Sequence, residues 1–327
     1  MFKYLLRKAA SWTLIVFLAT NITFFLASAF LDPRSNYIGR RPPLTPEQID
    51  TLLVPYNLSP TIPLWQRWWN WLSDILLHWN WGYSPTGSLV NDEISFRIWV
   101  SAQLMLVATL ITIVLGVSVG VYTASRQYQR GDRIWQAISI VAMNVHVVVA
   151  SIIVVAAAIK INDLVGARIL YVTGASNPSV EGFFPKLVDY AQHLILPTIA
   201  LVIIGYAGYH FMQRSLLLDN INADYVRTAR AKGLTKGQAI RRHALRTSII
   251  PVATSVAFAV PGIFTGAVLT EKIFAWNGMG VYFVETISKN DVHGAVAVAA
   301  FGAALTGVSA ILADLVVVAL DPRVRVS

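Results

Sequence analysis

The sequence predicts an all-α membrane protein with six transmembrane helices and a long extracytoplasmic segment after the first of them. Hydrophobic residues make up 55% of the 327 residues and charged residues only 13%, whereas soluble domains carry roughly 25% charged residues. Runs of about 20 apolar residues cross a bilayer as helices, because a helix satisfies its own backbone polar groups. Six such runs occur, at about 10–31, 98–123, 134–159, 191–213, 249–271 and 294–320. None shows the alternating pattern of a membrane barrel strand.

These runs divide the chain into three parts. Residues 1–31 form the N-terminus and the first helix, and residues 32–97 form the extracytoplasmic segment. Residues 98–327 form a five-helix core that contains a long polar loop at 214–248. We expect this loop to be the part of the core that contacts other proteins.

The first apolar run has a second interpretation. Lys3, Arg7 and Lys8 precede it, and it ends in Ala27-Ser28-Ala29, which resembles the cleavage site of a signal peptide. The run is longer than the apolar part of a usual signal peptide. We therefore expect a retained helix, with cleavage as the alternative.

Positive charge gathers on one side of the predicted helices. The N-terminus, 124–133, 214–248 and 321–327 hold 16 of the 26 Lys and Arg residues but only four of the 17 acidic residues. The positive-inside rule therefore places both termini and these loops in the cytoplasm. The same asymmetry accounts for the net charge of +9, so we expect no nucleic-acid partner.

The sequence offers no pattern for catalysis or for metal binding. The chain has no cysteine, which excludes disulfides and zinc–thiolate sites. The motifs H-E-x-x-H and G-x-x-x-x-G-K-[ST] do not occur, and the one match to G-x-S-x-G, Gly116–Gly120, lies inside an apolar run that predicts a membrane helix. The six histidines are scattered: His78, His146, His193, His210, His243 and His293. We expect no catalytic residue, no metal and no ATP site on this chain.

The extracytoplasmic segment contains a predicted amphipathic helix at about 64–79. Its apolar face carries Trp65, Trp68, Trp69, Leu72, Leu76 and Trp79. Tryptophan favours the membrane interface, so this face is expected to lie there. The compatible alternative is that the helix helps to dock an external substrate-delivery protein.

Small residues at four-residue spacing predict close helix packing. Gly116 and Gly120 form one such pair and Gly262 and Gly266 another, and Ala303 and Gly307 line a stripe of the last run with Ala295 and Ala299. Small side chains let helix backbones approach. The packing is expected within one subunit, with a partner-subunit interface as the alternative.

Three ionisable residues are candidates for a role in translocation or gating. Asp314 lies in the sixth run, His146 in the third and Glu271 at the end of the fifth. A charge at membrane depth is a functional candidate by default. The alternatives are an ion pair or a helix cap for Asp314 and a packing role for His146.

The polar loop 214–248 is expected to form two short helices. Asn222 or Asp224 is expected to cap the first, and Gly233 to end it. Thr235 and Gln238 fit a capping box for the second. The first helix presents Tyr225, Val226 and Ala229 as an apolar patch, flanked by Arg227, Arg230 and Lys232. Such a patch fits the groove of a partner protein, whereas a solvated loop attracted to anionic lipid is the alternative.

This loop resembles the EAA loop of ABC-importer permeases, and more narrowly that of their oligopeptide/dipeptide/nickel branch. The resemblance is carried by Tyr225–Gly233, by Arg242–Arg246 and by Pro251; Arg227-Thr228-Ala229 stand in the E-A-A places. Further stretches resemble the first, or B-type, permease of such systems: Trp81–Ser84, Glu271–Phe274, Gly278–Gly280 and Asp321–Arg325. The resemblance covers essentially the whole chain but is weaker at 135–190, where Asn144-Val145-His146 replaces a proline-containing turn.

The resemblance implies a type I ABC-importer permease fold in the cytoplasmic (inner) membrane. It also implies a division of labour among several chains. The first loop helix would be a coupling helix that sits in a cleft of a cytoplasmic ATPase, and ATP with Mg²⁺ would bind that ATPase, whether it is a separate subunit or fused to another chain. A second, C-type permease and an external substrate-binding protein would complete the system. The ATPase-coupling residues implied are Asp224, Tyr225, Val226, Arg227, Thr228, Ala229, Arg230, Lys232 and Gly233.

The substrate and the class of transporter have alternatives. Peptides are favoured over nickel, because a metal path profits from clusters of His, Cys or carboxylate ligands. Nickel chelates, glutathione and opines are alternatives within the same branch. A secondary transporter is the alternative of another class, although it typically uses intramembrane carboxylates and inverted repeats. An intramembrane enzyme or receptor is the least favoured.

Overall fold

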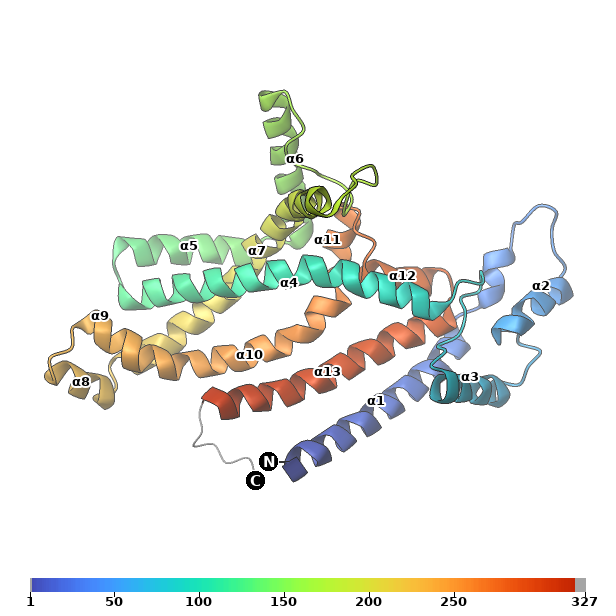
Figure 1. Ribbon diagram of the computed structural model, residues 1–327, viewed down its shortest axis with the longest axis horizontal. Coiled ribbons are helices and arrows are strands. Elements are labelled where there is room, and N and C mark those ends of the chain that lie inside the picture. Colours follow the sequence, from blue (N-terminus) through green and yellow to red (C-terminus); the bar gives the residue numbers. More distant parts are fainter. Residues whose placement is uncertain (1, 321–327) are drawn as a thin grey trace. The chain divides into compact units, whose positions relative to one another are not determined.

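The computed structural model describes residues 2–320, which form helices joined by loops (Figure 1). The α-helices are α1 (Phe2–Phe30), α2 (Pro46–Leu53), α3 (Leu64–His78), α4 (Val90–Ser125), α5 (Arg130–Asn144), α6 (Val147–Val165), α7 (Phe183–Ile221), α8 (Asp224–Ala231), α9 (Lys236–Ala239), α10 (Leu245–Thr265), α11 (Val268–Ile273), α12 (Met279–Ser288) and α13 (Val292–Leu320). Three short turns complete the elements: η1 (Pro33–Tyr37), η2 (Val54–Tyr56) and the π-helical turn η3 (Ile240–Ala244).

Six helical stretches of the described chain are long and apolar enough to cross a membrane. They are Lys3–Phe30, Val90–Ser125, Val147–Val165, Phe183–Ile221, Lys236–Ile273 and Val292–Ala319. Five of them contain most or all of a predicted run. The number of spans and the all-α class agree with the sequence analysis, and the chain is an integral membrane protein.

The third predicted run is the exception. The expected continuous helix at 134–159 is wrong, because α5 ends at Asn144 and α6 begins at Val147. His146 is the N-cap of α6, and its Nδ1 accepts a hydrogen bond from the backbone N–H of Val148 at 3.3 Å. Its side chain is exposed in the described chain. An imidazole that satisfies a first-turn N–H stabilises a new helix start, which explains the break.

The chain forms two compact units. The first comprises the chain up to Ala102 together with Phe264–Val268 and Asn277–Val308. Its core joins the extracytoplasmic segment to α1 and to the start of α13. Phe24 of α1 stacks on Trp71 of α3 with ring centroids 4.7 Å apart, and Trp68 Nε1 donates to Asn21 Oδ1 at 2.6 Å. The extracytoplasmic segment is therefore packed on the first helix rather than tethered loosely to it.

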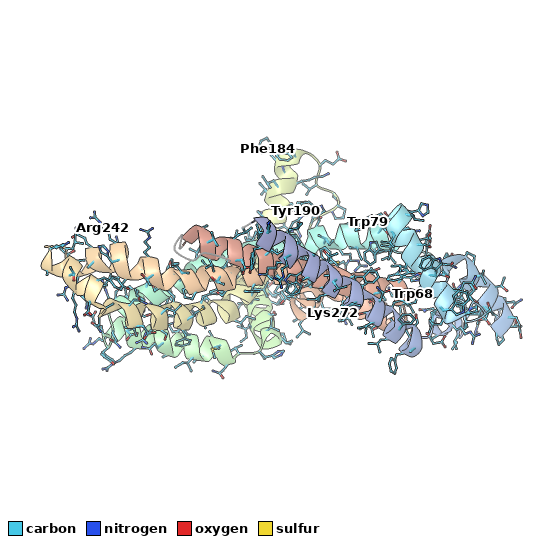
Figure 2. All side chains as sticks on the ribbon, turned by 90° about the horizontal axis from the view of Figure 1, so that it is seen from below. Trp68, Trp79, Phe184, Tyr190, Arg242 and Lys272 are labelled. Atoms are coloured by element: carbon cyan, nitrogen blue, oxygen red, sulfur yellow. The ribbon has the colours of Figure 1, made fainter. Side chains whose placement is uncertain are left out.

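Helix α3 matches its predicted range, but a large part of its apolar face is exposed. Trp71 and Leu72 are buried, whereas Trp65, Trp69 and Leu76 are 69%, 59% and 70% exposed. Trp79, just after the helix, is also exposed (Figure 2). An open row of large apolar side chains fits a membrane interface or a partner protein.

The second unit comprises Gln103–Ile263, Leu269–Trp276 and, of the described residues, 309–320. Helices α4 and α7 are in close contact at two glycines in this unit. A Cβ atom added to Gly116 would lie 2.5 Å from Tyr209 Cβ and 2.6 Å from the Tyr206 carbonyl oxygen. At Gly120 it would lie 2.8 Å from both Gln213 Cβ and the His210 carbonyl oxygen. This Gly-x-x-x-Gly pair therefore packs two helices of one chain together.

The other predicted packing residues behave differently. Gly262 has no neighbouring atom within 4 Å of its would-be Cβ, and Gly266 has a φ of +77° just after α10 ends. The expectation of packing within the subunit is therefore wrong for Gly262 in the described chain, whereas packing at Gly266 and a partner-subunit interface stay predictions. Gly307 does pack against α1, since its would-be Cβ lies 3.2 Å from Trp12 Cβ. Ala303, one turn earlier, is half-buried.

The two glycine pairs lead to opposite expectations for alanine substitution. Gly116→Ala forces α4 away from the α7 backbone, and overpacking of this kind costs about 1–3 kcal/mol. Gly262→Ala meets open space and gains about 0.5–1 kcal/mol of helix propensity. Thermal unfolding of the purified full-length chain in detergent should show a lower midpoint for Gly116→Ala and an unchanged or higher one for Gly262→Ala. Equal shifts for the two variants would contradict the close approach of α4 and α7.

Candidate functional site

The candidate site is the loop that connects α7 to α10. Helix α8 begins at Asp224, and its N-cap is Ala223 rather than Asn222 or Asp224 as predicted. Gly233 ends the first half of the loop with a φ of +94°. Thr235 and Gln238 form the predicted capping box, in which the Thr235 hydroxyl accepts from Gln238 N–H at 3.3 Å and the Gln238 amide oxygen accepts from Thr235 N–H at 3.1 Å. Both halves of the loop are thus ordered by local hydrogen bonds.

The apolar side of α8 faces its own chain. Val226 is 2% exposed and Ala229 is 7% exposed. They belong to a buried cluster whose other members are Ala124, Leu217, Ala239, Ile240 and Ala244. The prediction of one exposed apolar patch formed by Tyr225, Val226 and Ala229 is therefore wrong, although Tyr225 itself is 42% exposed. An amphipathic pattern shows which residues need cover, but it does not show whether the same chain supplies that cover.

The other side of α8 is polar and exposed. It carries Asp224, Arg227 and Thr228, with Lys232 just after the helix. The Arg227 guanidinium lies 3.9 Å from the Asp224 carboxylate, and both side chains are largely in solvent, so this pair contributes little to stability. The Tyr225 hydroxyl donates to Asn220 Oδ1 at 2.6 Å. Most of the predicted coupling residues are thus free to meet a partner, whereas Val226 and Ala229 are not.

A buried ion pair ties the start of α5 to α7, near the end of α7 that leads into the loop. Arg214 Nε and Nη2 donate to the two Asp132 oxygens at 3.0 and 3.1 Å. Asp132 is fully buried and also accepts from the Tyr128 backbone N–H at 2.8 Å and from Gln136 Nε2 at 2.7 Å. Burial by itself raises the pKa of Asp132, but the hydrogen bonds from Arg214, Tyr128 and Gln136 outweigh it, and the pKa lies below its usual value.

A second polar contact joins α4, α5 and α7 one turn deeper. His210 Nε2 lies 3.0 Å from Thr123 Oγ1, and His210 Nδ1 lies 2.7 Å from Ser139 Oγ. All three side chains are buried. The sequence analysis missed this group and the Asp132–Arg214 pair. The one available signal was that Asp132 is the only acidic residue of the basic segment 124–133.

The three gating candidates do not form a metal centre. Glu271 is fully buried in α11, His146 is exposed at the start of α6, and Asp314 is half-buried in α13. The described residues contain no group of three or more His, Cys, Asp or Glu side chains placed to hold a metal ion. A role in translocation stays a prediction for all three. The terminal stretch Asp321–Arg325 lies outside the described residues.

Comparison with known proteins gives a consistent result. Residues 113–326 match the family described as "Binding-protein-dependent transport system inner membrane component". The chain is 36% identical to the oligopeptide transport system permease protein OppB of Mycobacterium tuberculosis, with 100% of both chains covered. It is 31% identical to the dipeptide transport system permease protein DppB of Lactococcus lactis and 28% identical to OppB of Escherichia coli, in each case over 99% of this chain and 100% of the relative.

The Asp132–Arg214 pair can be tested by removing its carboxylate. Asp132→Asn leaves a partly buried guanidinium without its counter-charge, and breaking a buried pair in this way costs about 3–5 kcal/mol. We expect a marked fall in the thermal midpoint of the full-length chain at pH 7. Asp219→Asn, which removes an exposed carboxylate from the same region, should leave the midpoint unchanged.

The same variant has a defined pH dependence. The pKa of Asp132 is lower in the folded chain than the value of about 3.9 expected for the unfolded chain. Its stabilisation is therefore present above about pH 4 and is lost as the pH falls through the folded pKa. The difference between parent and Asp132→Asn should shrink below about pH 4. A constant difference, or one no larger than that of Asp219→Asn at pH 7, would contradict the role of the pair.

Proposed function

The chain belongs to the family of binding-protein-dependent transport system inner membrane components, and we propose that it is the permease subunit of an ATP-driven importer of oligopeptides or dipeptides. Its likeness to oligopeptide and dipeptide permeases over its full length carries the proposal. The geometry of the loop between α7 and α10 supports it, because an ordered helix offers a polar, exposed face to a partner.

In the proposed mechanism, α8 is the coupling helix. Its exposed face, with Asp224, Arg227 and Thr228, docks in a cleft of a cytoplasmic ATPase. Its buried face, with Val226 and Ala229, passes the movement to α4 and α7. ATP and Mg²⁺ bind the ATPase, which is a separate chain or is fused to another chain, and ATP binding switches the permease between inward- and outward-open states.

Other chains complete the importer. A second, C-type permease supplies the other half of the translocation path, and an extracytoplasmic binding protein delivers the substrate. The exposed tryptophans of α3 either lie in the membrane interface or contact that binding protein. Nickel chelates and glutathione are the alternative substrates within the branch, and a secondary transporter is the alternative of a different class.

We place the chain in the cytoplasmic membrane with both termini in the cytoplasm. The arrangement follows from the positive-inside rule, because the α4–α5 connection and the loop between α7 and α10 carry much of the basic charge. Helices α2 and α3 then lie outside, where a binding protein can reach them.

The orientation can be tested with single cysteines, because the chain has none of its own. A cysteine at Ser73 on α3 should react with a membrane-impermeant thiol reagent in intact cells. A cysteine at Thr235 should react only after the cells are opened. The reverse pattern would place the loop between α7 and α10 outside the cell and would exclude it as an ATPase contact.

The substrate can be tested by growth. A strain that lacks this gene should fail to use a short peptide as its only source of a required amino acid, and the complemented strain should recover. Purification of the tagged chain from that strain should also recover an ATPase subunit, which a secondary transporter would not bring with it. Normal peptide use together with a defect in nickel uptake would reverse the choice of substrate.

A further inference from the structure

A cavity of about 330 Å³ lies behind the coupling helix. This volume falls at the lower end of the roughly 300–1,000 Å³ found for small-molecule sites. Its walls come from the end of α4 and the α4–α5 connection, from the end of α7, and from α8, α9 and η3. The lining residues used below are Arg126, Leu218, Ile221, Arg230, Lys236 and Ile240.

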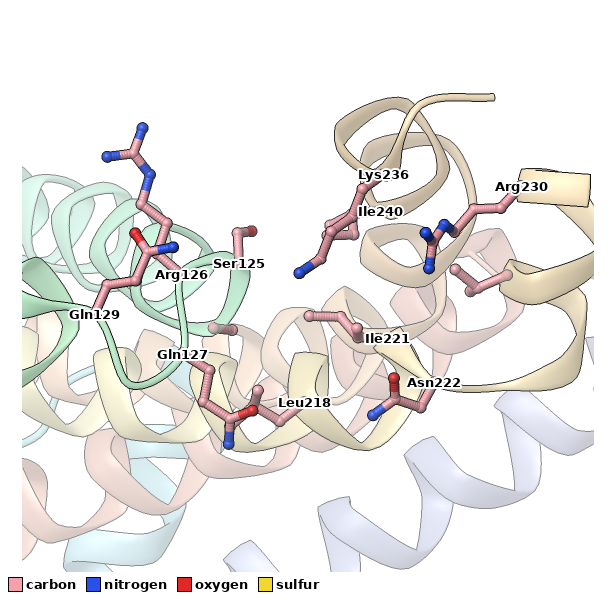
Figure 3. A pocket seen from close by; sticks show the side chains of 12 residues that line it. Ser125, Arg126, Gln127, Gln129, Leu218, Ile221, Asn222, Arg230, Lys236 and Ile240 are labelled. Atoms are coloured by element: carbon pink, nitrogen blue, oxygen red, sulfur yellow. The ribbon is translucent and has the colours of Figure 1, made fainter. Parts of the chain in front are cut away.

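The charge of the lining is entirely positive. Arg126, Arg230 and Lys236 line the cavity, and no lining residue is acidic. Figure 3 shows the Lys236 amine and the Arg230 guanidinium pointing into the space between these helices, whereas the Arg126 guanidinium points away. Arg126 has its own partner, since its guanidinium lies 4.9 Å from the centre of the Tyr122 ring. Within residues 2–320 neither Arg230 nor Lys236 forms an ion pair with a carboxylate, so both remain available to an anion from outside.

The cavity lies where two of the candidate membrane spans end. Two of its walls are the ends of helical stretches that are long and apolar enough to cross a membrane, and these stretches finish at Ser125 and Ile221. Leu218, Ile221 and Ile240 give the cavity apolar side chains next to its cations. A soluble anion gains nothing from such side chains, but a lipid presents its charged headgroup and its apolar chain together. Basic pockets between transmembrane helices bind anionic headgroups in this way.

We propose that this cavity binds the phosphodiester headgroup of an anionic phospholipid, with Arg230 and Lys236 as the charged ligands. Arg230 lies four residues after Val226 and three after Arg227, so it stands at the edge between the buried face of α8 and the exposed face that carries Asp224, Arg227 and Thr228. The lipid therefore contacts the edge of α8 that faces the cavity, next to the face proposed for the ATPase. A bound headgroup holds α8 against the ends of α4 and α7 while the ATPase contacts its outer face.

The proposal adds a lipid site to the proposed function. It rests on that function only for the assignment of the cavity to the cytoplasmic side of the membrane. Binding itself is measurable without any partner chain. Failure of peptide import would therefore leave the lipid result standing, and failure of lipid binding would leave the import result standing.

The test is native mass spectrometry of the purified full-length chain in mild detergent, titrated with phosphatidylglycerol. We expect one tightly bound phosphatidylglycerol per chain, weaker binding of the zwitterionic phosphatidylcholine, and weaker binding in high salt. The double variant Arg230→Gln/Lys236→Gln should lower the affinity for phosphatidylglycerol roughly ten- to thirtyfold. Each single variant should show about half of that effect on a logarithmic scale.

The matched control is Arg241→Gln/Arg242→Gln, which removes two exposed charges from the same loop but none from the cavity lining. Arg242 projects from the surface of η3 (Figure 2), and this variant should bind phosphatidylglycerol like the parent. An equal loss in both double variants, or no loss in either, would overturn the site. Equally tight binding of inorganic phosphate would overturn the lipid as its occupant. Displacement of the lipid by the bound ATPase would assign the cavity to the ATPase instead.

Discussion

The second unit depends on how closely the α4 and α7 backbones approach at Gly116 and Gly120. With any side chain at these positions the helices would have to separate, because the nearest atoms include backbone carbonyl oxygens of α7. Successive contacts follow toward the end of the two helices. His210 meets Thr123 one turn after Gly120, Arg214 meets Asp132 one turn after His210, and Leu217 joins the cluster under α8 one turn after Arg214.

This series of contacts links the position of α8 to the transmembrane helices, as the proposed coupling role requires. Helix α8 has only eight residues, which is too short to be stable alone in water. Its apolar residues are covered by α4, α7 and η3, so its position is set by the transmembrane helices. Any partner that moves the exposed face of α8 must also move the ends of α4 and α7 or break the cluster that contains Val226 and Ala229.

Local features of this structure were predictable from the sequence, and contacts between distant residues were not. The range of α3, the stop at Gly233 and the capping box at Thr235 depend on residues within a few positions of one another. The break at His146 was missed because Asn144 and His146 are the only two polar residues near it, in an apolar stretch that is otherwise long enough for one span. The burial of Val226 and Ala229 and the pairing of Asp132 with Arg214 depend on contacts between distant segments. Asp132 and Arg214, for example, are 82 residues apart in the sequence. A one-dimensional pattern carries no information about which of several segments supplies the cover.

The proposed function requires that the exposed face of α8 contacts the ATPase while its other face is held by the chain itself. The most direct measurement uses a cysteine in place of Thr228, an exposed residue of α8. Because the parent chain has no cysteine, this thiol is the only one in the variant, and its reactivity is measured. A thiol reagent should label it rapidly in the isolated chain and slowly in the assembled complex with its ATPase. The labelling of a cysteine at Ser73 should be the same in both samples. Equal labelling of the Thr228 position with and without the ATPase would contradict the claim.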